Sequence, residues 1–391
     1  MKQLKISHHT LTSALGHGRD AQLAALREGR SGLKEKTFET CALPCWIGEV
    51  DGLDTPLPAP FAQWDCRNNR LAWLALQQDG FVEAAARLRG QYGATRVGVF
   101  IGTSTAGVHS TELAYRARDA AGALPGWFNY RTTQNCFSPA DFVRHVLGLE
   151  GVAIAVATAC SSSAKVFGCA QRAIAVGLCD AAVVGGVDSL CLTTLYGFNS
   201  LQLIAPDICR PADASRCGIS IGEAAGFAIV EKPAGTGLAL LGYGESSDAH
   251  HMSAPHPQGE GALAAMRGAL RRAGLETGDV DYINLHGTAT PANDAAEDKA
   301  VCALFGTQTP CSSTKGWTGH ALGAAAITEA AFSLLCIEHG FMPQSLNTRE
   351  RDPALQGNIL LEPRVTRVDR VLSNSFGFGG NNCSLLFGRV G

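Results

Sequence analysis

Residues 157–164 read ATACSSSA, and this stretch decides how the chain folds around its most reactive side chain. The residues just before it, 152–156, are small or β-branched, as in a buried strand. A segment with helical periodicity follows and stops at Gly177. We therefore expect Cys160 at a sharp strand-to-helix turn. There the positive end of the helix would lower the pKa of the thiol below about 8.5 and favour the thiolate.

A thiolate in that position predicts the nucleophile of an acyl-transferring enzyme. The alternative is a buried cysteine with only a packing role, which we expect for most of the 14 cysteines in the chain. The sequence has no CxxC pair and no Cys/His spacing typical of zinc, so we expect no metal site.

Composition excludes several classes of protein. The 391 residues are 46% hydrophobic and 17% charged, and 32 basic against 35 acidic residues give a net charge of −3. This balance argues against a nucleic-acid partner. We find no run approaching the roughly 18 apolar residues of a membrane span, and the first residues lack the apolar core of a signal peptide. We therefore expect a cytoplasmic protein.

Strand-like and helix-like segments alternate along the chain, which predicts an α/β fold with largely parallel, buried sheets. The order of elements repeats after about residue 235, so we expect two similar halves, 1–235 and 236–391. The predicted strands are 96–102, 152–156, 181–187, 226–231, 238–243, 280–285, 310–314, 370–374 and 383–387. The predicted helices are 67–78, 81–89, 111–121, 192–203, 261–273, 295–305 and 321–338.

Three further stretches place polar residues where predicted strands end. His286 lies in NLHGT at 284–288, at the carboxyl end of an apolar strand, where α/β folds place ligands. His320 ends STKGWTGH and precedes a helix, whose positive end should keep the imidazole neutral. The glycines of NSFGFGGN at 374–381 allow main-chain N–H groups to approach an oxyanion. Each stretch alone is typical of an ordinary loop, but together with Cys160 they indicate one site.

These stretches, TACSSSA, HGTAT, STKGWTGHALGAA and NSFGFGGNN, resemble the β-ketoacyl-acyl carrier protein synthases. Those enzymes condense acyl groups in fatty acid and polyketide synthesis. The resemblance keeps the family's order and spacing over nearly the whole chain. It implies the thiolase fold, in which two duplicated α/β halves form an α-β-α-β-α layered architecture.

The resemblance also implies a mechanism. Cys160 would accept an acyl chain from a carrier-protein thioester, and its N–H and that of Phe378 would form the oxyanion hole. His286 and His320 would hold the malonyl thioester while carbon dioxide leaves and the new carbon–carbon bond forms. No metal or organic cofactor is implied, because the substrates travel on the phosphopantetheine arm of acyl carrier protein.

Other residues receive expected roles from the same resemblance. Lys315 would support the site through an ion pair with Glu329, and Phe378 would act as an aromatic gate of the acyl pocket. Thr288 and Thr290 would hold the phosphopantetheine arm, and the small side chain of Thr105 would leave the acyl pocket deep. The residues expected to contact substrate are Thr105, Thr288, Thr290, Phe376 and Glu329.

The family's partners are expected as well. Acyl carrier protein is acidic, so Arg67, Arg70, Arg210 and Arg216 are candidates for its docking surface. The resemblance implies a dimer, formed either by two copies or with a ketosynthase-like subunit. The aromatic stretch 126–138 is expected at a subunit interface or a pocket wall.

Departures from the family pattern suggest a branch. Other residues are usual at five positions, which here hold Lys165, Trp317, Asn381, His250 and the small Thr105. These departures favour a specialised ketosynthase such as those of aryl polyene pigment clusters. Four alternatives remain open at this point: a non-catalytic partner of the chain-length-factor type, a thiolase acting on coenzyme A with Cys383, a priming synthase using Asn374, and a binding module.

Overall fold

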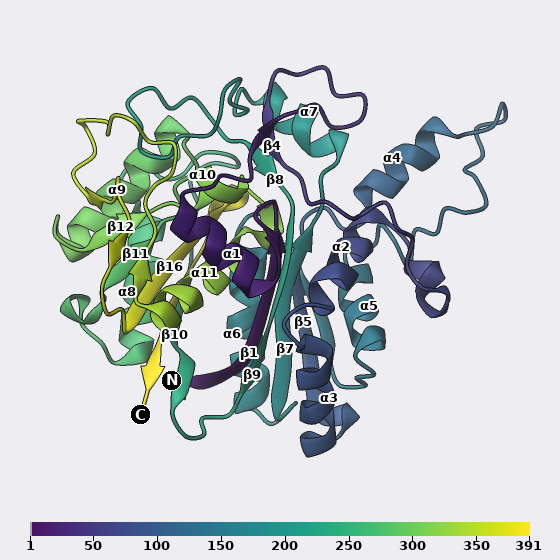
Figure 1. The fold of residues 1–391 in the computed structure, drawn as a ribbon, viewed down its shortest axis with the longest axis horizontal. Coiled ribbons are helices and arrows are strands. Elements are labelled where there is room, and N and C mark those ends of the chain that lie inside the picture. Colours follow the sequence, from purple (N-terminus) through teal and green to yellow (C-terminus); the bar gives the residue numbers. More distant parts are fainter. Residues whose placement is uncertain (1) are drawn as a thin grey trace.

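The two halves of the chain build the same arrangement of five strands, as the computed structural model of residues 2–391 shows (Figure 1). The N-terminal half has the order β6-β5-β7-β9-β1, and the C-terminal half has β12-β11-β16-β17-β10. The strands are β1 (Leu4–Ser13), β5 (Val97–Gly102), β6 (Ala153–Val156), β7 (Ala181–Asp188), β9 (Ala224–Glu231), β10 (Gly237–Ser247), β11 (Tyr282–Asn284), β12 (Pro310–Ser312), β16 (Arg370–Gly377) and β17 (Asn381–Val390).

Strand direction follows the same rule in both halves. In the first, β5 pairs parallel with β6 and β7, whereas β9 runs antiparallel to both β7 and β1. In the second, β11 pairs parallel with β12 and β16, whereas β17 runs antiparallel to both β16 and β10. The expectation of largely parallel sheets was therefore wrong. One reason is that only the short loop 378–380 joins β16 to β17, and a parallel pair needs a long crossover.

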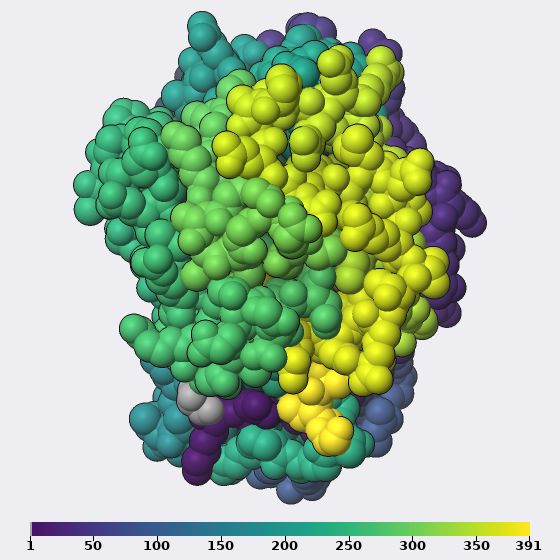
Figure 2. All heavy atoms as spheres, turned by 90° about the vertical axis from the view of Figure 1, so that its left-hand side faces the viewer, coloured from purple at the N-terminus to yellow at the C-terminus, as the bar shows by residue number. Residues whose placement is uncertain are grey.

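The two five-stranded sheets are joined edge to edge into one continuous sheet where β1 pairs with β10, at Leu4 opposite Leu240 and Lys5 opposite Ala239. Helices α6 (Ser162–Ala175) and α11 (Ala325–His339) lie between the sheets, and their apolar residues share one core with strands of both halves. Outer helices complete five layers: α2 (Arg67–Leu76), α3 (Phe81–Tyr92) and α5 (Ser138–Val146) on one side, α8 (Glu260–Ala273) and α9 (Pro291–Phe305) on the other. Figure 2 looks onto the C-terminal half, whose green and yellow residues cover most of that face.

The central layer explains one apolar helix. Leu322–His339 is long and apolar enough to cross a membrane by length and composition, contrary to the expectation that no such run exists. However, 89% of this stretch is buried inside the protein. A helix that is covered by sheets on both sides is apolar all round, so its composition reflects its place in the core.

Most predicted elements are present, with shifted ends. Helix α1 (Gly18–Glu28) stops at Gly29, whose φ of 68° suits a left-handed cap. The helix expected at 111–121 is α4 (Val108–Arg116), and the one at 192–203 is α7 (Leu192–Ser200). The irregular segment after residue 33 contributes β3 (Lys34–Glu35) and β4 (Trp46–Gly48), which join β8 (Ile221–Gly222) in a small sheet.

One side of the N-terminal half carries exposed apolar residues. Strand β6 is the outermost strand of its sheet, and Ile154 on it is exposed. Between α4 and α5 a long loop projects from the body of the molecule (Figure 1), and Trp127 and Tyr130 on it are exposed. Exposed apolar surface of this kind is typical of an interface with another chain.

Candidate active site

The nucleophile lies at the predicted sharp turn. Strand β6 ends at Val156 and helix α6 begins at Ser162, so only a short turn separates them. Ala159, just before the cysteine, has a φ of 52°, a left-handed conformation that is costly for a residue other than glycine. Ser162 Oγ accepts a hydrogen bond from the Thr158 N–H at 2.9 Å and closes the turn. This strained turn presents Cys160 to the interior of the molecule, where it is 5% exposed.

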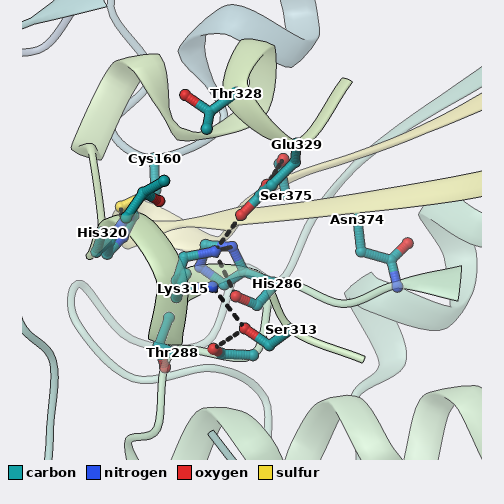
Figure 3. A network of polar contacts seen from close by, with 12 residues as sticks. Cys160, His286, Thr288, Ser313, Lys315, His320, Thr328, Glu329, Asn374 and Ser375 are labelled. Carbon is teal, nitrogen blue, oxygen red and sulfur yellow. Dashed lines mark hydrogen bonds and ion pairs between the residues drawn. The ribbon is translucent and has the colours of Figure 1, made fainter. Parts of the chain in front are cut away.

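Two histidines from the other half of the chain face Cys160. His320, between α10 (Lys315–Thr318) and α11, places its Nε2 3.1 Å from the Cys160 Sγ. His286 follows β11, and its ring meets that of His320 edge to face with centroids 5.4 Å apart. Figure 3 shows the cysteine and His320 close together, with His286 beside them. The structure therefore brings together the three side chains that the sequence placed at separate strand ends.

Lys315 contacts both the ring and the main chain of His286. Its ammonium donates to Glu329 Oε1 at 2.5 Å, to the His286 carbonyl, and to His286 Nδ1 at 3.3 Å. The predicted ion pair with Glu329 is thus confirmed, and the Lys315 side chain is only 2% exposed. Because an ammonium has no acceptor, Nδ1 of His286 must accept, and the ring proton is left on Nε2.

The cysteine is not the low-pKa thiol that the helix end led us to expect. Burial raises the pKa of Cys160 to about 12, while the Lys315 charge and the N–H of Phe378 oppose that rise. The expectation was wrong because residues distant in sequence cover the sulfur, and loss of water outweighs the favourable field. The resting nucleophile is therefore a thiol, and the imidazole at 3.1 Å is positioned to take its proton.

Both imidazoles are neutral, which was expected only for His320 and there from the end of a helix. Burial lowers the pKa of His286 and of His320 well below the ordinary value, and the Lys315 charge lowers both further. A neutral imidazole can donate a hydrogen bond from its ring N–H to a developing oxyanion. The pair therefore suits stabilisation of an enolate.

The glycine-rich loop packs directly on the nucleophile turn. A Cβ added at Gly377 would come within 3.2 Å of the amide nitrogens of Cys160 and Ser161. The N–H of Phe378 donates to the cysteine sulfur, and Gly379 has a φ of 77°. Main-chain donors from two segments therefore converge at Cys160, which is the arrangement that an oxyanion hole requires.

Cys160 and both histidines open into one cavity of about 400 Å³. Thr288, Thr290, Phe376 and Phe378 line it as expected, and the two threonine hydroxyls lie 2.8 Å apart. Its apolar wall contains residues that sequence reasoning missed: Phe198, Leu201, Leu203 and Ile219. No sequence signal identified them, because Phe198 lies on α7, which mixes polar and apolar residues, and the other three lie in the loop that follows it, where no periodic pattern says which side faces a cavity.

Two residues expected to contact substrate do not line this cavity. Thr105 is buried, and its hydroxyl donates to Asp188 Oδ1 at 2.8 Å, so we withdraw its assignment as a residue that sets pocket depth. Glu329 lies behind Lys315, where Ser375 Oγ donates to its second oxygen at 3.4 Å. Its role is to pair with the lysine, and the assignment to substrate contact was wrong.

Sequence reasoning also missed Glu297. This buried carboxylate on α9 accepts the main-chain N–H groups of His286 and Gly287, both at 2.8 Å. It also accepts the Asn374 amide at 3.1 Å, and burial raises its pKa to about 7. Glu297 therefore fixes the turn that carries His286.

The four arginines proposed for carrier-protein docking are all engaged in ion pairs. Arg67 binds Glu223 at 2.6 Å and Arg216 binds Asp352 at 2.6 Å, and both arginines are largely buried. Arg70 pairs with Asp65, and Arg210 with Asp207. The expectation is corrected for the two buried arginines, which link distant segments of the chain and present little charge to a partner.

Among residues 2–391, no group of three or more His, Cys, Asp or Glu side chains could hold a metal ion. The cysteines there are all unpaired, and most are buried. Cys383 lies in the core on β17, away from the cavity.

Comparisons with known proteins agree with this geometry. The family described as "Beta-ketoacyl synthase, N-terminal domain" matches residues 68–234, and "Beta-ketoacyl synthase, C-terminal domain" matches residues 238–349. The 3-oxoacyl-[acyl-carrier-protein] synthase 2 of Rhizobium meliloti is 34% identical over 422 residues, covering 100% of this chain and 99% of the relative.

Two solved structures show the same fold. One is the ketosynthase ApeO in complex with its chain length factor ApeC from Xenorhabdus doucetiae, with a TM-score of 0.92 and 37% identity, covering 100% of this chain and 98% of that one. The other, the ishigamide ketosynthase/chain length factor, has a TM-score of 0.90 and 28% identity, and both chains are covered completely.

Proposed function

The chain belongs to the β-ketoacyl synthase family, and on that premise we propose that Cys160, His286 and His320 carry out its condensation of an acyl group with a malonyl group. The observation that carries this proposal is the 3.1 Å contact between Cys160 Sγ and His320 Nε2 within the cavity that His286 also lines. The enzyme is an acyltransferase, and its substrates are thioesters of acyl carrier protein.

In the first step the acyl group moves to Cys160. The thiol proton passes to His320 Nε2 as the sulfur attacks the thioester carbonyl carbon. The N–H groups of Cys160 and Phe378 hold the resulting oxyanion, and one such donor is typically worth about 3 kcal/mol. The bond from that carbon to the carrier's sulfur then breaks, and the departing thiolate takes the proton from His320.

In the second step malonyl carrier protein occupies the cavity. The bond between its α-carbon and its carboxylate breaks, carbon dioxide leaves, and the electron pair forms an enolate. The Nε2–H of His286 donates to the enolate oxygen, joined by His320 once its ring has exchanged protons with solvent to the tautomer that carries the proton on Nε2, and the α-carbon attacks the acyl carbonyl on Cys160. The carbon–sulfur bond breaks, and one proton from solvent restores the thiol. We propose that no metal or organic cofactor takes part, because the substrates supply every electron pair used.

We also propose two partners: acyl carrier protein and a ketosynthase-like subunit. The second is supported by the exposed β6 edge, by the aromatic loop around Trp127, and by the two structural neighbours solved with chain length factors. A homodimer through the same surface is the alternative, and the mass of the complex formed with and without a co-expressed partner distinguishes the two. With all described cysteines unpaired, we propose the cytoplasm as its location.

For the pathway, we propose a specialised branch such as aryl polyene synthesis. Support comes from the similarity to ApeO and from Lys165 and Asn381, which depart from the usual family pattern and contact each other at 3.1 Å. Thr105 no longer supports this proposal, because its side chain faces Asp188.

The retained nucleophile argues against a non-catalytic chain length factor and against a binding module. A thiolase is disfavoured because Cys383 is in the core, and a priming synthase because Asn374 binds Glu297 and Ser384 outside the cavity. The function is tested by mixing the enzyme with acyl and malonyl carrier proteins. We expect a β-ketoacyl product that is absent with Cys160→Ala, and product formation by that variant would contradict the proposal.

A further inference from the structure

One buried carboxylate joins the two halves of the chain beside the active site. Asp188 ends β7 and is 0% exposed. Its oxygens accept hydrogen bonds of 2.5 to 3.0 Å from two segments of the chain. The donors are the N–H groups of Ser104, Thr105 and Gly323 and the hydroxyls of Thr103, Ser104 and Thr105.

On one side, Asp188 holds the turn that carries His320. The Gly323 N–H donates to Asp188 Oδ2 at 2.6 Å, and a Cβ at this glycine would lie only 2.7 Å from the same oxygen. The preceding Leu322 has a φ of 50°, a strained conformation that persists only when its surroundings fix it. The close approach and the strain show that this turn is held firmly against the carboxylate.

On the other side, Asp188 holds the loop that supports the nucleophile. The Thr103 N–H donates to the carbonyl of Val156, the last residue of β6, at 3.1 Å. At Gly102 an added Cβ would collide with the backbone of Ser162 and Ser163, where α6 begins. Loop 103–105 is therefore packed against both elements that flank Cys160.

The orientation of His320 depends on its main chain. Its Nδ1 is buried without a hydrogen-bond partner, in contrast to Nδ1 of His286, which Lys315 contacts. The His320 N–H donates to the Ser220 carbonyl at 2.8 Å, and its carbonyl accepts the Gly222 N–H at 3.0 Å. A further anchor of this turn is the Gly323 N–H, which contacts both Asp188 and Ser104 and so ties the turn to the loop 103–105.

We propose that Asp188 is a positioning residue that sets the separation between Cys160 Sγ and His320 Nε2. It touches neither substrate nor the reacting atoms, and it acts by fixing residues 103–105 and the turn 320–323 against each other. This inference rests on the proposed function.

The carboxylate also has an electrostatic effect on the nucleophile. The titratable groups around Cys160 are His320, His286, Lys315, Glu329 and Asp188. Burial is the main cause that raises the pKa of Cys160, and the negative charges of Asp188 and Glu329 raise it further. Removing the Asp188 charge should therefore lower that pKa.

The test compares Asp188→Asn with a matched control, Asp281→Asn. Asp281 accepts the N–H groups of Asp369 and Arg370, both at 2.8 Å, at the end of β11 opposite to His286. For each full-length variant, kcat and KM for condensation and the rate of Cys160 alkylation by iodoacetamide across pH are measured.

For Asp188→Asn we expect kcat to fall by about tenfold or more, because small misplacements of reacting groups are costly, with KM for acyl carrier protein within about twofold. We also expect its alkylation profile to move to lower pH. The control should change neither. A kcat of Asp188→Asn close to that of the control, or an unmoved alkylation profile, would overturn the inference.

If Asp188→Asn does not fold, Ser104→Ala replaces it, because this change removes one hydroxyl donor and one contact to the Gly323 N–H. A several-fold loss of kcat is expected, and an unchanged kcat would overturn the inference. If the wild-type protein condenses no carrier-protein substrate, the proposed function fails, while the alkylation profiles still decide the role of Asp188.

Discussion

The Lys315 ammonium lies 3.3 Å from Nδ1 of His286 and 2.5 Å from Glu329 Oε1, so one buried cation fixes both the tautomer of a histidine and the charge balance behind it. Figure 3 shows the lysine directly beside the imidazole of His286. Loss of the lysine should therefore affect both catalysis by His286 and the stability of the fold around Glu329.

Replacing the lysine in Lys315→Met should impair decarboxylation of malonyl carrier protein by about tenfold or more, because the His286 Nε2–H donor is no longer fixed. It should also destabilise the fold by about 3–5 kcal/mol, since Glu329 is left as an unpaired buried charge. Release of carbon dioxide and urea unfolding measure the two effects. The double variant Lys315→Met with Glu329→Gln should regain stability without regaining decarboxylation. Recovery of both would show that the lysine has no role beyond charge balance.

The raised pKa of Cys160 predicts slow, pH-dependent alkylation. Because burial raises the pKa to about 12, the rate should increase by close to tenfold for each pH unit between about pH 7 and about pH 9. Mass spectrometry of the peptide containing Cys160 separates this site from the exposed Cys136 and Cys217, which serve as internal controls. A plateau already reached at about pH 7 would mean a resting thiolate and would contradict this description.

The lowered pKa values of His286 and His320 make the folded protein sensitive to acid. In the unfolded chain both rings bind protons below about pH 6.5, whereas the folded protein keeps them neutral, so stability is lost as pH falls through that value. Each histidine should contribute up to about 1.4 kcal/mol per pH unit below it. Glu297, whose pKa is raised to about 7, acts in the opposite direction.

The wild type is compared with His320→Asn. Both proteins contain Glu297, so its effect on the pH dependence of stability cancels in the comparison. Urea unfolding at about pH 7.5 and about pH 5.5 should show a smaller acid loss for the variant. Equal losses in the two proteins would show that His320 is protonated in the folded state.

The apolar cavity wall on and beyond α7 should limit the length of the acyl chain. Leu201→Trp adds bulk at the wall lined by Leu201 and Phe198, so long acyl carrier proteins should load less while short ones load as before. Intact mass after incubation with acyl groups of increasing length measures this limit. Uniform loss at every length would indicate damage to the fold, and uniform retention would place the acyl chain elsewhere.

How far the sequence alone leads differs from residue to residue. The Cys160 turn was predictable because strand and helix periodicity, hydroxyl residues and Gly177 all lie within a short window. The ion pair between Lys315 and Glu329 was predictable from the family resemblance, and the structure confirms it. Local pattern and motif order therefore identify which residues meet.

Properties that depend on distant segments could not be predicted. The pKa of Cys160 is decided by burial under the His320 turn and the glycine loop, which come from the other half of the chain. The orientation of Thr105 is decided by Asp188, which lies 83 residues away. The cavity wall depends on which side of α7 and of the loop after it faces inward, and the local sequence carries no such information.

Intact mass spectrometry after incubation with acyl carrier proteins shows whether Cys160 carries the acyl group. We predict that the wild-type chain gains the mass of one acyl group, that Cys160→Ala gains none, and that addition of malonyl carrier protein removes the gain. Retention of the acyl mass by Cys160→Ala, or condensation by a wild-type chain that never gains this mass, would show that Cys160 is not the acyl carrier.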